Sequence, residues 1–556
     1  MPGREMRFWG WGEDARAGEP LAHGLDWLRE RLGTSPVAPS PPPCLDDLRL
    51  EPGALTGATL GELRAVVGAG GVRDDRAARV QHAAGKGYAD LVRLRGGDAR
   101  PAPDAVVWPA THAQTRAVLE LCARRGIAVV PFGGGTSVVG GVEPLRGSHG
   151  SVIALDTGRM SRLVALDERS CLAVLEPGLR GPEVEHLLRA RGWTLGHLPQ
   201  SFEYSTAGGW VATRSAGQAS TGYGRIDALV HGARLAAPAG DVVLPAMPAS
   251  AAGPDLRELL VGSEGVLGVL TQVTLRVRPR PASGRYEAWM LPGFQAGREA
   301  LRTLIQDGLA PDVARLSDEP ETEMSLVLAG GGLRSALLDR YLHARGMDGG
   351  ALTIVGWEGE PARVAWRRRG GAAVLRRFGG VALGPGPGRA WARGRFHAPY
   401  LRDDLLARGV LVDTLETAAP WSGLERLYRS VRDALGEHAP LVACHVSHLY
   451  PTGASLYFTF LARQDAGDPL GQWSRAKRAA CEAIVAAGGT ISHHHAVGRD
   501  HARYLPAEAS PLGADVLRAA KARLDPSGIM NPGKLLTDFP IDATDPAQRI
   551  WTGPLR

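Results

Sequence analysis

Three stretches of small residues limit the folds open to this chain. The first, PFGGGTSVVGG (131–141), directly follows the apolar segment IAVVP. Its three successive glycines remove every Cβ, so the backbone can turn tightly and present N–H groups to a pyrophosphate, and Thr136 and Ser137 add hydroxyl donors. The spacing is neither GxGxxG nor GxxxxGK[ST], which argues against Rossmann and P-loop sites. Taken alone, such a loop is better explained as a structural turn.

Two further stretches change that balance. PQSFEYSTAGGWVATRSAGQASTGYGRI (199–226) combines hydroxyls and paired glycines with almost no long side chain, and GSEGVLGVLTQVTL (262–275) repeats the theme before a strand. Three such segments, each beside a strand, suit a long ligand that lies across a sheet with backbone on several sides. The sequence therefore predicts an extended cofactor site.

The length of 556 residues predicts two or more subdomains. A helix over 113–125, a helix that begins at Gly181 with Pro182 in its first turn, and an alternating strand over 269–279 indicate an α+β body with mixed sheets. After about Arg280 a second α+β region begins. We expect an N-terminal arm and helical region over 1–100, a cofactor domain over 101–280, a substrate (cap) domain over 281–500, and a segment over 501–556 that packs back on the cofactor domain.

Two biased segments interrupt this pattern. The Pro-rich SPVAPSPPP (35–43) is typical of a linker between the arm and the body. The Arg- and Gly-rich run 367–395 lacks enough apolar residues to order itself, which leaves two interpretations. It is either a solvated loop or a mobile active-site cover whose arginines meet an anionic substrate.

The net charge of +6 does not predict nucleic-acid binding. Lysine is nearly absent, the arginine bias runs uniformly along the chain, and no nucleic-acid-binding motif accompanies it. The five scattered cysteines form no CxxC pair, no apolar run reaches the roughly 18 residues of a membrane span, and the first residues lack a signal-like apolar core. We expect a cytoplasmic protein, from a bacterium with GC-rich DNA.

At the three small-residue stretches the chain resembles the vanillyl-alcohol-oxidase (PCMH-type) flavoprotein superfamily, which binds FAD with these segments. The resemblance implies a two-subdomain α+β fold with a PCMH-type FAD-binding domain and an α+β cap. Tethered members carry a His in the glycine loop, where this chain has Phe132 and Gly133, so non-covalent FAD is expected. The implied cofactor-binding residues are Pro131, Phe132, Gly133, Gly134, Gly135, Thr136, Ser137, Gln200, Ser201, Ser205, Thr206, Gly208, Gly209, Thr213, Arg214, Ser215, Ala216, Glu264, Gly265, Val266, Leu267, Gly268, Val269 and Leu270.

Two branches of the superfamily compete. FAD-dependent D-2-hydroxyacid dehydrogenases resemble the chain in GSEGVLGV and in LDPSGIMNPGKLL (524–536). Their metal-binding GHxGDGNxH and SAEHG motifs are altered here, because Ser455 stands in place of the second His and His494 in place of the Glu. Too little of the imidazole-plus-carboxylate shell is left for a divalent cation, so no metal is expected.

The other branch is the alkyldihydroxyacetonephosphate synthase family. The resemblance runs from FWGWG (8–12) through VARLSD (313–318), YLRDDLLARGVLVDTLETAAPW (400–421), SHLYPTGASLYFTF (447–460) and HHHAVG (493–498). It implies exchange of the acyl chain of acyl-dihydroxyacetonephosphate for a fatty alcohol, without net redox change, through an adduct at flavin N5. The partners implied are these lipid substrates, with peripheral membrane contact and a homodimer as further options.

The same resemblance implies the roles of individual residues. Tyr457 is the acid/base candidate, with Tyr450 as the fallback and a half-buried strand aromatic as the structural alternative. The triplet His493, His494 and His495 supplies neighbours and proton relays, unless it is a chance surface cluster. Arg402 and Arg315 face the substrate phosphate, although Arg315 also suits an ion pair with Asp318 or another acid.

Two departures from the synthase pattern leave alternatives open. Ala496 follows the triplet where the family has Gly, and IMNPGKLL looks more like the hydroxyacid branch. Three other interpretations stay open: a diverged paralogue with another substrate, a D-2-hydroxyacid dehydrogenase, and a flavin-binding protein without catalysis.

Overall fold

The computed structural model describes residues 6–13, 24–33, 39–328, 330 and 333–536. Residues 35–38 of the predicted Pro-rich linker, much of the predicted arm, and residues 537–556 of the predicted C-terminal segment lie outside these ranges. Within the described residues no helix is both long enough and apolar enough to cross a membrane.

A four-stranded sheet forms one half of the molecule's body. Its strand order is β1 (Val72–Arg73), β2 (Ala105–Val107), β4 (Ser151–Asp156) and β3 (Ile127–Phe132), with β2 and β3 parallel to β4. Helices α2 (Gly57–Val67) and α5 (His112–Arg125) cover it; α5 begins after the capping hydroxyl of Thr111 and ends at Gly126. Helix α2 and strand β1, which precede the predicted boundary at residue 100, also pack in this core.

A five-stranded sheet and its helices form the other half of the body. The order is β5 (Leu163–Asp167), β6 (Leu172–Leu175), β10 (Val269–Arg276), β8 (Val230–Ala237) and β9 (Gly240–Leu244), with every pairing antiparallel. Strands β7 (Trp193–Thr194) and β11 (Arg278–Pro279) pair beside it. Its helices are α6 (Gly181–Arg189), α7 (Ala207–Ala212), α8 (Ser220–Tyr223), α9 (Ile226–Leu229) and α10 (Arg257–Leu260).

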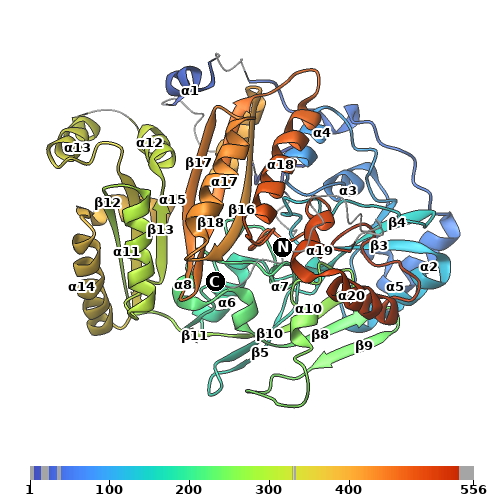
Figure 1. Ribbon diagram of the computed structural model, residues 1–556. Helices are drawn as coiled ribbons and strands as arrows, with labels where there is room; N and C mark the ends of the chain where they lie inside the picture. Colours follow the sequence, from blue (N-terminus) through green and yellow to red (C-terminus); the bar gives the residue numbers. More distant parts are fainter. Residues whose placement is uncertain (1–5, 14–23, 34–38, 329, 331–332, 537–556) are drawn as a thin grey trace.

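The cap is built on a seven-stranded antiparallel sheet. Its order is β15 (Val381–Gly384), β12 (Ser283–Leu291), β14 (Ala351–Gly359), β13 (Val313–Ser317), β17 (Leu441–Tyr450), β18 (Gly453–Arg463) and β16 (Val410–Pro420). Figure 1 shows α11 (Phe294–Gln306) and α14 (Pro361–Arg377) beside β12 and β13, while α17 (Leu424–Gly436) and α18 (Pro469–Ala486) lie by β16, β17 and β18. Leucines and aromatics of the sheet and these helices share one buried core.

The Arg- and Gly-rich run 367–395 forms helices and a strand, which corrects the prediction of a loop. It contains the second half of α14, then β15, then α15 (Pro385–Gly394). Helix α14 buries Val364, Ala372 and Leu375, so the apolar stripe begins upstream of the run. Two of its arginines pair with acids of the cap: Arg367 donates to Asp312 at 2.9 Å, and Arg368 donates to Glu287.

Helices at the two ends of the chain complete the fold. The C-terminal segment carries α19 (Leu505–Ala509) and α20 (Pro511–Leu524), and Lys521 Nζ donates to the carbonyls of Val266 and Met530 in the body. Met530 also bridges Val129 of β3, so residues up to 536 lie against the first sheet.

The remaining helices are α1 (Leu25–Leu32), η2 (Leu45–Asp47), η3 (Ala69–Gly71), α3 (Arg76–Gln81), α4 (Tyr88–Arg95), η4 (Thr157–Arg159), α12 (Glu319–Leu328), α13 (Leu333–Ala344), α16 (Ala398–Ala407) and η5 (Ala502–Tyr504).

Candidate functional site

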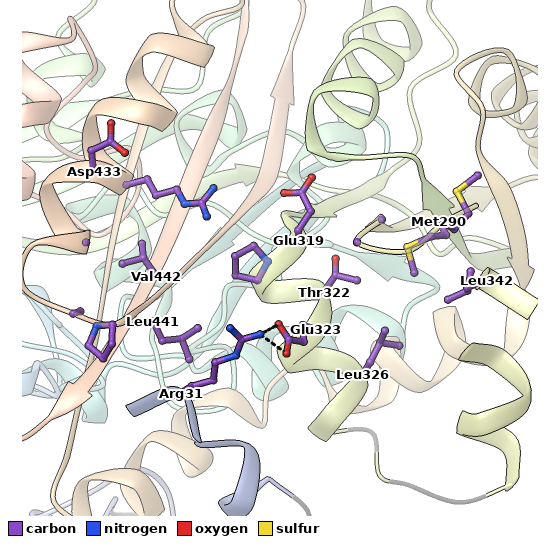
Figure 2. Close-up of a pocket in the computed structure, with 18 of the residues that line it drawn as sticks. Arg31, Met290, Glu319, Thr322, Glu323, Leu326, Leu342, Asp433, Leu441 and Val442 are labelled. Atoms are coloured by element: carbon purple, nitrogen blue, oxygen red, sulfur yellow. Dashed lines mark hydrogen bonds and ion pairs between the residues drawn. The ribbon is translucent and has the colours of Figure 1, made fainter. Parts of the chain in front are cut away.

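A cavity of about 860 Å³ lies in the cap, away from every predicted site residue. Figure 2 shows the ion pair of Arg31 with Glu323 of α12 at its edge, and apolar side chains such as Leu326 and Val442 in its wall. None of the lining residues belongs to the glycine loop, the histidine triplet or the tyrosines. The predicted site residues therefore lie outside this cavity.

A row of three side chains crosses the cap sheet. Glu416 on β16 lies directly opposite Tyr457 on β18, and Tyr457 lies opposite His445 on β17. Residues directly opposite one another in adjacent antiparallel strands project from the same face. The Tyr457 ring stacks on His445 with 4.8 Å between centroids. Tyr457 is partly exposed in its strand, whereas Glu416 and His445 are buried.

The histidine triplet lies over this row. It follows α18 in a loop and brings its rings to Tyr457: His494 stacks at 6.1 Å and His495 meets the phenol edge-on at 5.4 Å. His493 is buried, and the other two rings are partly buried. The structure thus brings Tyr457 and the triplet together from segments about 40 residues apart, and the triplet is not a chance surface cluster.

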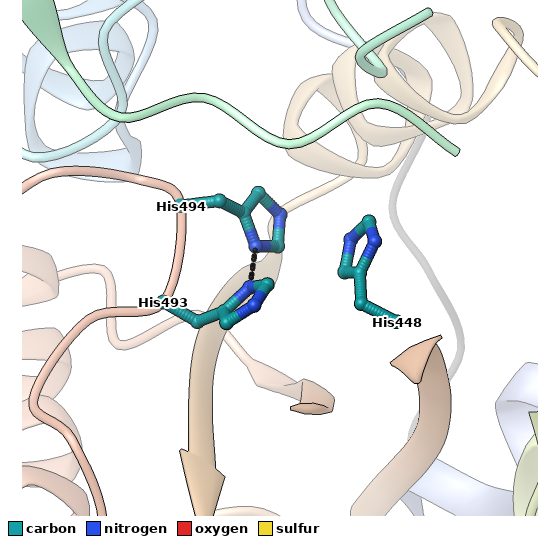
Figure 3. A group of neighbouring side chains, drawn as sticks. All are labelled: His448, His493 and His494. Carbon is teal, nitrogen blue, oxygen red and sulfur yellow. Dashed lines mark hydrogen bonds between the residues drawn. The ribbon is translucent and has the colours of Figure 1, made fainter. Parts of the chain in front are cut away.

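Two more side chains of β17 join the triplet. Tyr450 Oη lies 2.7 Å from His493 Nε2, and His493 Nδ1 lies 2.9 Å from His494 Nδ1, so one of that pair of nitrogens donates to the other. His448, buried and 2.6 Å from Ser220 Oγ, stacks against His493 (Figure 3). Sequence reasoning missed His448, although its i, i+2 spacing with Tyr450 on a strand was an available signal.

Burial sets the protonation states of these groups. Burial lowers the pKa of His448 and of His493 well below the usual value and the pKa of His495 to about 3, so these imidazoles are neutral near pH 7. Burial raises the pKa of the Tyr457 phenol and brings that of Tyr450 to about 12. The resting cluster therefore holds protonated phenols beside neutral imidazoles, which can accept a proton.

The two predicted substrate arginines have different surroundings. Arg315 pairs with Glu321 at 2.7 Å, and Glu321 contacts His445 at 2.9 Å. Burial alone would raise the pKa of Glu321, but Arg315 and His445 hold it at about 2. Arg315 thus takes up the ion pair that was its alternative role, with Glu321 and not with Asp318. It supports the histidine that underlies Tyr457.

Arg402 lies beside the glycine loop. Its Nη1 donates to the carbonyl of Lys86, whose own N–H donates to Ser137 of that loop. Its Nε and Nη2 are buried and find no hydrogen-bond partner among the described residues. No hydrogen bond or ion pair within those residues joins Arg402 to the triplet, so the glycine loop is the element that it adjoins.

The predicted cofactor segments pack against one another through their glycines. An added Cβ at Gly134 would overlap the backbone oxygen of Tyr204, and one at Gly265 would lie 2.8 Å from the Pro131 ring. Thr206 caps α7 by accepting from the Gly209 N–H, so the STAGG turn becomes the start of a helix. The loop, the turn and the GSEG segment therefore form one continuous surface.

Glu264 joins that surface to the triplet. Its carboxylate accepts the N–H groups of Val497 and Gly498 at 2.8 and 2.7 Å, and the Arg499 N–H donates to Val139 at the end of the glycine loop. This side chain, predicted to bind the cofactor, is committed to the loop after the triplet. Arg214, predicted likewise, pairs with Glu258 at 2.6 Å.

The same surface offers polar atoms for a bound cofactor. Gln200 Nε2 and Ser263 Oγ are buried and lack hydrogen-bond partners in the described part of the chain. Unpaired buried polar atoms are costly, so a ligand that satisfies them is expected there. Together with the close-packed glycine loop, they fit an extended cofactor such as FAD.

Three of the imidazoles are close enough to bind a metal ion. One ring nitrogen each from His448, His493 and His494 lies within 4.8 Å of the others. Figure 3 shows the three rings as neighbours. However, His448 Nδ1 contacts Ser220 and both nitrogens of His493 are in hydrogen bonds. Ser455, which replaces a ligand histidine of the hydroxyacid branch, instead accepts the backbone N–H of His448 at 3.1 Å. The donor set is thus arranged as a hydrogen-bonded chain.

Comparison with known proteins identifies the class. The profile described as "FAD binding domain" matches residues 103–244, and the one described as "FAD linked oxidases, C-terminal domain" matches residues 280–535. A solved p-cresol methylhydroxylase with bound substrate shares the fold at 15% identity and a TM-score of 0.65, covering 87% of this chain and 98% of that one. The protein is a flavoprotein of the PCMH-type fold with an FAD-linked oxidase C-terminal domain, as predicted.

The family follows from two nearer relatives. The alkyldihydroxyacetonephosphate synthase of Trypanosoma brucei brucei is 32% identical over 98% of this chain and 94% of its own length. A solved alkyldihydroxyacetonephosphate synthase superposes with a TM-score of 0.83 at 28% identity, over 95% of this chain and 98% of that one. The chain belongs to the alkyldihydroxyacetonephosphate synthase family.

Proposed function

We propose that this protein is an FAD-dependent alkyldihydroxyacetonephosphate synthase, which exchanges the acyl chain of acyl-dihydroxyacetonephosphate for a fatty alcohol. The observation that carries the proposal is that the phenol ring of Tyr457 contacts the rings of His445, His494 and His495. The loop that carries His494 and His495 is hydrogen-bonded to the glycine loop. When bound, FAD supplies an electron-accepting ring that is oxidised again at the end of each turnover. The lipid substrates suit loose contact with a membrane surface; that contact, a homodimer and a bacterial cytoplasmic location stay predictions.

The chain's own residues supply proton transfer and anion binding. Tyr457 removes and returns the proton at C1 of the dihydroxyacetonephosphate unit, and His494 accepts the phenol's proton while it does so. The Tyr450–His493–His494 hydrogen bonds extend that path away from the substrate. Arg402 binds the phosphate: two of its buried donors lack hydrogen-bond partners among the described residues, although Nη2 lies 3.9 Å from Asp403 Oδ1, and a guanidinium presents paired N–H groups to phosphate oxygens.

A direct assay tests this function. Acyl-dihydroxyacetonephosphate and hexadecanol are added without oxygen, and we expect an ether product, released fatty acid and a flavin spectrum that is oxidised at the end. Prolonged chelator treatment leaves the rate unchanged, because the proposed steps need no metal ion. Bleaching of the flavin by D-lactate or D-2-hydroxyglutarate, without ether product, would assign the protein to the dehydrogenase branch instead.

The mode of flavin attachment has its own test. Phe132 and Gly133 occupy the glycine-loop positions where tethered members carry a His, so residues 131–141 contain no imidazole. The neighbouring His82, 4.3 Å from Phe132 between ring centroids, has both ring nitrogens in contacts with Ala78 and Asp156. We expect acid precipitation of the yellow protein to release FAD into the supernatant, measured by absorbance and chromatography. Flavin that stays with the pellet after washing would contradict non-covalent binding.

A further inference from the structure

Glu416 is a buried carboxylate with four donors from one short segment. It accepts the backbone N–H groups of His493, His494 and His495 at 2.6, 2.9 and 2.7 Å, and the hydroxyl of Ser492 at 2.9 Å. Its side chain is 1% exposed. Every donor therefore comes from the histidine loop, and no water is needed to satisfy the charge.

Three successive N–H groups that point at one anion form a nest, in which the backbone itself is the binding site. Such a nest fixes the φ and ψ angles of the residues that make it, and hence the direction of their side chains. Immediately after the nest, Ala496 takes a φ of +74°, and the next two N–H groups are held by Glu264. Two buried carboxylates, one from the cap and one from the body, thus hold the loop on both sides of that turn.

The position of Glu416 in the sheet links the histidine loop to Tyr457. Glu416 on β16 is the direct cross-strand neighbour of Tyr457 on β18. The strand pairing fixes one residue relative to the other, and the nest fixes the imidazoles relative to Glu416. One carboxylate therefore sets the placement of the three rings against the phenol, although it contacts the phenol through neither hydrogen bond nor ion pair.

The charge of Glu416 fits the same role. Burial opposes ionisation, but the contacts with His494 and its neighbours hold the pKa of this carboxyl well below the usual value. An ionised carboxylate accepts through both oxygens, and hydrogen bonds to a charged group are the stronger ones. A neutral amide of the same shape has one acceptor oxygen and would turn its NH₂ group toward at least one of the three N–H groups.

We propose that Glu416 is a positioning residue that orients the histidine triplet over Tyr457, an inference that rests on the proposed function of that cluster. The role is separate from substrate contact, because every oxygen of Glu416 is used within the chain. It is also separate from general core stability, because the four donors belong to the loop that carries the triplet.

The test compares three variants with the intact FAD-loaded protein. Glu416→Gln keeps size and removes charge, whereas Glu416→Asp keeps charge and shortens the reach. Glu185→Gln is the matched control: Glu185 is buried in the body and accepts the Thr194 hydroxyl and the N–H groups of Leu195 and Gly196. For each we measure FAD occupancy, kcat, KM for acyl-dihydroxyacetonephosphate, and amide hydrogen exchange over 491–498.

We expect Glu416→Gln to lower kcat on the order of 100-fold with KM and FAD occupancy retained, because misplacement by about 1 Å costs this much in rate. In Glu416→Gln the amide exchange over 491–498 also rises. Glu416→Asp recovers part of kcat, and Glu185→Gln keeps kcat and the amide exchange near wild type. Wild-type kcat and exchange in Glu416→Gln overturn the inference, as does a loss of kcat that only follows lost FAD. If wild-type protein makes no ether product, the proposed function fails, while the exchange measurement still decides whether the anchor exists.

Discussion

Tyr457→Phe is expected to lower kcat for ether formation by about 10³–10⁴-fold, the upper part of the range for general acid–base groups, while the flavin spectrum stays unchanged. The substitution removes one hydroxyl from a partly exposed strand position and leaves the ring stacked on His445. Packing is therefore retained and the proton-transferring atom is lost. Single-turnover kinetics with acyl-dihydroxyacetonephosphate measure the loss directly.

Tyr450→Phe and Tyr428→Phe are the controls for that result. Tyr450 contacts His493 at 2.7 Å and lies one step further along the proton path, so its loss lowers kcat by only about 10-fold, less than the loss of an acid/base group. Tyr428 donates its hydroxyl to buried Asp318 at 3.0 Å in the same core and lies outside the cluster, so its loss affects stability and not kcat. Retained activity in Tyr457→Phe with inactive Tyr450→Phe would reassign the acid/base role to Tyr450.

The segments that could be predicted are those whose chemistry is local. The glycine loop, the STAGG turn and the GSEG segment each carry their backbone requirement within about ten residues, and the α+β, PCMH-type fold inferred from them is confirmed. Helix α5 is a similar case, because its capping Thr111 and terminal Gly126 stand beside the apolar positions that it buries.

The Arg- and Gly-rich run shows where local composition misleads. Residues 367–395 taken by themselves show no apolar helix face. The helix that contains the first of them begins at Pro361, and that whole helix has a buried apolar face. Its glycines are also used in packing: an added Cβ at Gly371 would lie 2.8 Å from the ring of Trp357. Composition over a window counts apolar residues, but the stripe that orders a helix depends on where the helix begins.

Site residues that act through distant partners could not be predicted either. Glu416 meets the triplet across 77 to 79 residues, and this contact depends on the pairing of β16 with β18. Arg315 was expected at the substrate, whereas the start of α12 brings Glu321 to it. Neither the register of a sheet nor the placement of a helix against it follows from residue spacing alone.

Gly134→Ala is expected to weaken FAD binding by about 100-fold or more. The added methyl group would overlap the backbone oxygen of Tyr204 and lie 2.8 Å from its carbonyl carbon and 2.9 Å from the Cα of Ser205. These are backbone atoms of the neighbouring cofactor segment, so no rotamer change relieves the overlap and the glycine loop and the turn must separate. Overpacking in tight sites costs roughly 3 kcal/mol or more, which is about 100-fold or more in the FAD dissociation constant.

Gly150→Ala separates this steric effect from the general effect of replacing glycine. Gly150 precedes β4 in the same body, and an added Cβ there has no heavy atom within 4 Å. Both substitutions restrict the unfolded chain alike, so only the overlap at Gly134 distinguishes them. Flavin absorbance per protein and FAD titration of the apoprotein give the comparison, and a circular-dichroism melt shows whether the body has unfolded. Because the loop, the turn and the triplet are linked in series through Val139 and Glu264, full FAD occupancy in Gly134→Ala would contradict the placement of the cofactor on this surface.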